Sequence, residues 1–251
     1  MLLYRHSNKR SRFAAREWIE DYNSITGRWR MMKTEQIGGP WQGFGTLRQF
    51  ARKPKARAEQ CELCNVGLRS DHSHLIDVTK RKLLCACDAC AILFGGRAGA
   101  KFKRVPRRVC RLADFQMTDA EWDGLLIPIN LAFFCEDSME SRVMALYPSP
   151  AGATESLLPL EAWTHIVQAN AILNQLEPDV EALLVNRVGQ ARGAAPAEYY
   201  LVPIDACYRL VGLIRMHWRG LSGGTEVWQE IGKFFFELRA RAEAATEAMH
   251  A

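Results

Sequence analysis

The stretch that decides the fold is residues 61–90, CELCNVGLRSDHSHLIDVTKRKLLCACDAC, which holds five of the eight cysteines. Cys61 and Cys64 form one C-x-x-C pair, and Cys87 and Cys90 form a second pair. A tight turn lets two thiolates at this spacing bind one cation, and two such pairs complete a tetrahedral sulfur site. The pattern predicts a metal site made by these four cysteines, with structural zinc as the bound ion.

Additional donors between the two pairs leave the ligand set open. Cys85, His72 and His74 are alternative ligands; in the other interpretation they are a buried strand residue and two surface histidines. Sulfur ligation suits zinc and iron–sulfur clusters alike, so the residue types do not decide the metal. An iron–sulfur cluster is therefore the alternative cofactor.

The order of local patterns predicts a treble-clef or zinc-ribbon-like module. The first cysteine pair forms a knuckle, residues 74–78 and 82–85 form two short strands, and the second pair opens a helix that Gly95 and Gly96 end. A helix amino terminus stabilises the negative charge of a thiolate.

Charge is distributed unevenly along the chain. Residues 1–111 carry 24 Lys and Arg against 9 Asp and Glu, a net charge of +15, whereas residues 112–251 carry a net charge of −10. The basic and acidic halves could dock on one another, or each could serve a different partner.

The densest basic run is residues 97–111, RAGAKFKRVPRRVCR, which has seven basic residues and no acidic one. Its candidate residues for binding an anion or a partner are Arg97, Lys101, Lys103, Arg104, Arg107 and Arg108. Binding to nucleic acid is one alternative, but few aromatic residues alternate with the basic ones, as a single-strand binder would need. An acidic protein partner fits this run at least as well.

The second half predicts an α+β domain, a mostly antiparallel sheet with helices on one face. Strands are expected at residues 127–135, 142–147, 180–188 and 199–202, with residues 148–153 as a loop. Helices are expected after the capping box at residues 118–121, at residues 160–176 and 204–219, and after Gly223 and Gly224. The predicted division is an extension at residues 1–45, a basic cysteine-rich module at 46–111, and an acidic α+β domain at 112–251.

The sequence lacks the motifs and segments that are typical of several classes of protein. No apolar run is long enough to span a bilayer, and no secretory signal precedes the thiol-rich module, so we expect a cytoplasmic protein. No G-x-S-x-G, Walker or G-x-G-x-x-G motif is present, and no convincing catalytic constellation indicates an enzyme.

One specific enzyme class needs separate consideration. Asp71 and His72, followed by LLCACDAC, resemble an HNH nuclease with an embedded zinc site, in which such a histidine acts as general base. However, the interval from His72 to Cys87 is short for the catalytic loop of that family, contains no asparagine, and is not followed by the family's helix histidine. A nuclease is therefore the less favoured alternative.

A set of longer motifs carries a family resemblance over roughly residues 45–240. The motifs are CELC, HSHLID, RKLLCACDACAILF, RVPRRV, LADFQMTDAEWDGLLIPINLAFF, ALYPSPAGATESLLPLEAW, EALLVNR, YYLVPIDACYRLVGLIR and WRGLSGGTEVW. Together they resemble an uncharacterised bacterial domain-of-unknown-function family, whose genes often lie beside those of high-affinity nickel–iron hydrogenases. The resemblance implies an accessory role in hydrogenase assembly, maturation or electron supply. The implied partner is a hydrogenase subunit or a maturation factor.

Overall fold

The computed structural model describes residues 59–96, 99–156, 160–191, 195–220 and 223–250. The described residues belong to one compact unit. The predicted extension at residues 1–45 lies outside the described residues.

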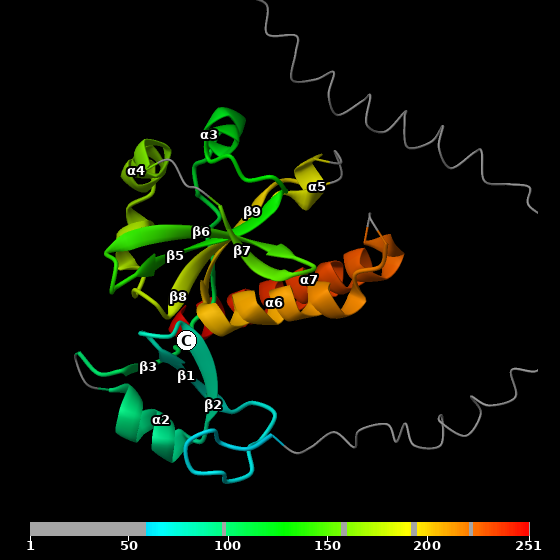
Figure 1. Ribbon diagram of the computed structural model, residues 1–251. Helices are drawn as coiled ribbons and strands as arrows, with labels where there is room; N and C mark the ends of the chain where they lie inside the picture. The colour runs from blue at the N-terminus through cyan, green and yellow to red at the C-terminus, as the bar shows by residue number, and fades with distance from the viewer. Residues whose placement is uncertain (1–58, 97–98, 157–159, 192–194, 221–222, 251) are drawn as a thin grey trace, which may run out of the picture. The chain divides into compact units, whose positions relative to one another are not determined.

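A small antiparallel sheet and one helix follow the first cysteine pair (Figure 1). Strands β1 (Ser73–Asp77) and β2 (Lys82–Ala86) form a hairpin, and β3 (Phe102–Arg104) pairs with the other edge of β1. Helix α2 (Asp88–Gly95) starts directly after β2. Knuckle, hairpin and helix follow one another in the order that the sequence predicts for a treble-clef module.

A six-stranded antiparallel sheet forms the rest of the scaffold, in the order β4-β9-β8-β5-β6-β7. The strands are β4 (Cys110–Arg111), β5 (Leu131–Asp137), β6 (Arg142–Ser149), β7 (Gly152–Ser156), β8 (Glu181–Asn186) and β9 (Glu198–Pro203). The predicted α+β class with an antiparallel sheet is confirmed. Because β4 belongs to this sheet, the chain enters it at residue 110; the predicted boundary after residue 111 stays a prediction.

Helices cover both faces of the larger sheet, so the expectation of helices on one face was wrong. Helices α6 (Ile204–His217) and α7 (Gly224–His250) lie side by side on one face (Figure 1). Helices α3 (Asp119–Gly124) and α4 (Leu160–Ala169) and the 3-10 helix η2 (Ala171–Gln175) pack on the other face, and the short helix α5 (Val188–Ala191) follows β8.

The two faces explain why the central strands are almost continuously apolar. Side chains alternate between the faces, so Phe133 of β5 packs in the core under α6 and α7 while Phe134 stacks on Trp163 of α4, with ring centroids 4.9 Å apart. Both phenylalanines are fully buried. Covering both faces buries every position of β5 except Glu136, which removes the polar alternation of a one-sided sheet.

Three local predictions needed correction. Residues 160–176 form α4 and η2 and not one helix, because the buried Asn170 side chain bonds the carbonyl oxygens of Ile166 and Gln116 between them. The predicted loop at residues 148–153 shrinks to a turn between β6 and β7, and the two-residue strand β4 was not predicted.

Candidate metal centre

The first cysteine pair sits in a tight knuckle. The Cys61 N–H donates to the Val66 carbonyl oxygen (2.8 Å), and the Asn65 N–H donates to the Cys61 carbonyl oxygen (2.8 Å). Asn65 adopts φ 61°, a left-handed conformation that asparagine tolerates better than most residues and that turns the chain back after Cys64. The turn leaves Cys61 fully buried and Cys64 exposed.

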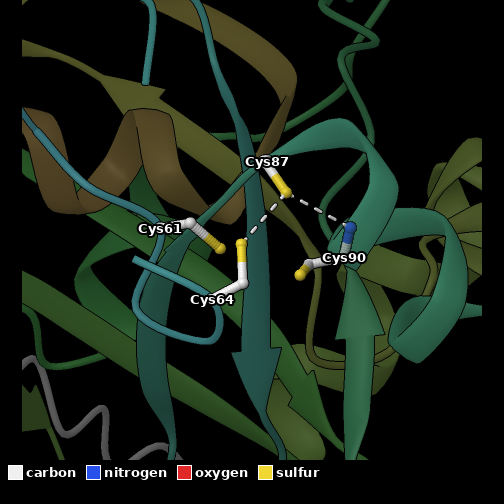
Figure 2. Close-up of side chains that lie close together, drawn as sticks. All are labelled: Cys61, Cys64, Cys87 and Cys90. Atoms are coloured by element: carbon white, nitrogen blue, oxygen red, sulfur yellow. Dashed lines mark hydrogen bonds between the residues drawn. The ribbon is translucent and has the colours of Figure 1, made fainter. Parts of the chain in front are cut away.

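The second pair sits at the start of α2. Cys87 is the N-cap residue, and its sulfur accepts a hydrogen bond from the Cys90 N–H at 3.4 Å (Figure 2). This position places both sulfurs at the positive end of the helix, where peptide N–H groups stabilise thiolate charge. The expected role of the helix amino terminus is therefore present in the geometry.

The four sulfur atoms of Cys61, Cys64, Cys87 and Cys90 point toward one another, and all lie within 4.8 Å of each other (Figure 2). The sulfurs of Cys64 and Cys87 are 3.7 Å apart. A tetrahedral zinc ion with Zn–S bonds of about 2.3 Å requires sulfurs about 3.8 Å apart, and this spacing matches. All four are free thiols, so the cluster can hold a metal ion such as zinc.

The protonation of the cluster shows why it suits a cation. Burial raises the pKa of Cys61, but N–H groups of Cys87, Cys64 and Leu63 donate to its sulfur and bring the pKa down to about 6. Burial, together with hydrogen bonds among the sulfurs, raises the pKa of Cys90 to about 12. The Cys61 thiolate therefore forms readily while Cys90 keeps its proton, and ionisation of both sulfurs together needs a positive ion between them.

The alternative ligands gather in a different place. Donor atoms of His72, His74 and Cys85 lie within 4.8 Å of one another, as a group separate from the four cysteines. His74 and Cys85 are direct partners across the β1–β2 hairpin. We call these three residues the His–Cys group.

Most of the candidate anion-binding residues have partners within the chain. Lys103 pairs with Asp179 (2.7 Å), and Arg108 pairs with Glu181 (2.8 Å), both on the acidic half of the molecule. Lys101 pairs with Asp77 (3.5 Å), and Arg107 donates to the Asp71 carbonyl oxygen. Arg104 is exposed, and Arg97 lies outside the described residues.

These pairs give the charge asymmetry a structural explanation. The basic stretch docks on the acidic half of its own chain, as one of the two sequence-based alternatives expected. The charges of Lys101, Lys103 and Arg108 are thus partly compensated within the chain.

An apolar pocket lies between the larger sheet and α6 and α7. Trp218 and Trp228 line it together with Tyr147, Pro150 and Ile231. Trp163, in contrast, is only 7% exposed and belongs to the core on the opposite face of the sheet. No helix among the described residues has the length and apolarity needed to cross a membrane.

Comparison with family models places the chain in a family. Residues 60–242 match the family of unknown function DUF5947, and the chain belongs to that family. This confirms the resemblance to a domain of unknown function, with the match starting at residue 60 and not near 45. No curated protein and no solved structure matches the chain. The comparisons contain no link to hydrogenases, so that part of the resemblance stays a hypothesis.

Proposed function

We propose that the protein binds one structural zinc ion through Cys61, Cys64, Cys87 and Cys90 and acts as a non-catalytic accessory protein for a larger enzyme. The observation that carries the zinc proposal is the convergence of four sulfurs within 4.8 Å. Four protein sulfurs fill a tetrahedral shell completely, which is the pattern of structural zinc sites and leaves no position for a substrate.

The spacing of the sulfurs favours a single ion over the alternative iron–sulfur cluster. A cluster places several iron and sulfide atoms among its cysteines and needs more room than one ion. The 3.7 Å separation of the Cys64 and Cys87 sulfurs fits two ligands of the same ion.

The accessory role depends on binding a protein partner, and we propose a nickel–iron hydrogenase subunit or maturation factor. The support for this partner is the motif resemblance alone. The pocket beside Trp218 and Trp228 supports the capacity to bind a partner, because tryptophans on a concave apolar surface are common anchors at interfaces.

The zinc proposal is tested by metal analysis and a visible absorption spectrum of anaerobically purified protein. We expect zinc with no visible absorbance in the wild type, and loss of zinc from the four-cysteine cluster in Cys64→Ser. The exposed position of Cys64 makes it the least disruptive cysteine of the cluster to replace. Cys110→Ser, a partly exposed thiol on β4, is the matched control and should keep its zinc. A brown protein that contains iron and sulfide would reject the zinc proposal in favour of an iron–sulfur cluster.

The partner proposal is tested by deleting the gene and measuring hydrogen uptake and association of the hydrogenase subunits. We expect both to fall, and to recover with the wild-type gene but not with the Cys64→Ser gene. Unchanged activity and unchanged subunit association in the deletion strain would reject the hydrogenase role and leave the zinc proposal standing.

A further inference from the structure

The His–Cys group lies on the opposite face of the β1–β2 hairpin from the four-cysteine cluster. Leu75, Leu84 and Ala86 point toward α2 and pack with Cys61 and Cys90. Successive side chains of a strand alternate between its faces. His74 and Cys85 therefore point the other way, and His74 contacts Asp205 at the start of α6.

Hydrogen bonds fix which nitrogen of each histidine is free. The Nδ1 of His72 lies 2.8 Å from the Arg69 carbonyl oxygen, which can only accept, so Nδ1 carries the proton and Nε2 keeps its lone pair. The Nδ1 of His74 lies 2.9 Å from the Asp205 carboxylate, which sets the same tautomer. A carboxylate or carbonyl on Nδ1 is the usual support for a histidine that binds a metal through Nε2.

His72 gives the strongest sign that something is bound here. Its side chain is only 7% exposed, and its buried Nε2 has no hydrogen-bond partner among the described residues. A buried lone pair without a partner is unfavourable, because the nitrogen has lost water and gained nothing in exchange. The rings of His72 and His74 stand edge to face with centroids 4.7 Å apart, so the two side chains lie next to one another.

From this geometry we infer a second metal site, in which His72 Nε2, His74 Nε2 and Cys85 Sγ bind a divalent transition metal of the zinc class. Two imidazoles and one thiolate form a borderline-soft donor set that suits zinc. One ring nitrogen of each histidine and the Cys85 sulfur lie within 4.8 Å of one another.

Three protein ligands leave the fourth tetrahedral position open for water or a small anion, in contrast to the closed four-cysteine site. His74 is 23% exposed and Cys85 is partly exposed, so solvent has access to this side of the group. The site also bridges two parts of the fold, because its His74 is held by Asp205 of α6.

The test is the zinc content of the full-length protein after zinc saturation and removal of excess ion, measured by native mass spectrometry. We expect two zinc ions per chain in the wild type and one in His72→Gln, His74→Gln and Cys85→Ser. His165→Gln, on the exposed side of α4, and Cys110→Ser are the controls and should keep two. The same zinc content in the wild type and in the three variants would overturn the site.

A second measurement needs no variant and so does not depend on variant folding. X-ray absorption at the zinc edge of the saturated wild type should show sulfur ligands mixed with imidazole nitrogens. A spectrum with sulfur ligands alone would reject the His–Cys group as a ligand set. The X-ray absorption spectrum also separates this proposal from the structural-zinc proposal. If the four-cysteine site bound no zinc, the one remaining zinc would still show nitrogen ligands.

Discussion

The contact between the cysteine-rich module and the larger sheet includes one buried carboxylate with a two-point ion pair. Glu181, at the start of β8, is 4% exposed in its side chain and receives two hydrogen bonds from the Arg108 guanidinium, at 3.0 and 2.8 Å. This carboxylate also accepts a hydrogen bond from the Glu177 N–H at 3.1 Å. We predict that Arg108→Ala destabilises the protein by leaving this carboxylate buried without its cation.

The magnitude follows from the exposure of the two partners. Removing one partner of a fully buried ion pair costs about 3–5 kcal/mol. The Arg108 side chain is 44% exposed, so water replaces part of its interaction, and the Glu177 N–H remains. We therefore expect a loss of about 2–3 kcal/mol, which is roughly a 30- to 150-fold change in the unfolding equilibrium.

Arg69 provides a matched control, because it forms the same kind of ion pair at a solvent-exposed position. Its guanidinium also forms two hydrogen bonds to one carboxylate, that of Asp71, but the two side chains are 87% and 58% exposed. Arg69→Ala should cost less than about 1 kcal/mol. The difference between the two variants isolates the effect of burial.

Urea unfolding at constant zinc concentration measures both variants. With a slope of about 2–3 kcal/mol per molar urea, Arg108→Ala should lower the midpoint by about 1 M. Arg108→Lys should recover only part of the loss, because lysine restores the charge but not the two-point hydrogen bonding. Equal stability of Arg108→Ala and Arg69→Ala would refute the reasoning that burial of Glu181 makes this pair important.

Three further predictions concern acid stability, thiol reactivity and the core. Burial raises the pKa of Asp137, but the N–H groups of Glu140 and Met139 and the Arg81 guanidinium lower the pKa overall. The contribution of the Asp137 carboxylate to folding stability is therefore complete above about pH 4 and is lost as the pH falls below that value. Asp137→Asn should thus show a smaller loss of melting temperature between pH 5 and pH 3 than the wild type, and equal losses would contradict this. Burial raises the pKa of Cys135 to about 12, so iodoacetamide at about pH 8 should leave it unmodified in the folded protein, as a peptide map would show. Phe134→Ala should cost about 3–5 kcal/mol by urea unfolding, because it removes a fully buried ring stacked on Trp163, and a cost below about 1 kcal/mol would argue against that packing.

The sequence by itself determined the cysteine cluster and much of the secondary structure. A C-x-x-C spacing fixes the distance between two thiolates through a local turn, so Cys61 with Cys64 and Cys87 with Cys90 could be paired without knowledge of the fold. The capping box at Thr118 and Glu121 could also be predicted from the sequence, because both of its hydrogen bonds form within one helical turn.

Only the tertiary structure decided the features that depend on distant residues. The Asp205 carboxylate that orients His74 is 131 residues away in the chain, and no local pattern marks either residue as the partner of the other. Cys85 and Cys87 are two residues apart and would share a face if the strand continued. Because β2 ends at Ala86 and Cys87 caps α2, the two sulfurs belong to different groups. Likewise, a continuous apolar strand indicates that both of its faces are covered but does not identify the covering elements. Only the tertiary structure shows that α3 and α4 cover the second face. Local spacing fixes local chemistry, whereas contacts between distant segments arise from packing that the chain completes only when it folds.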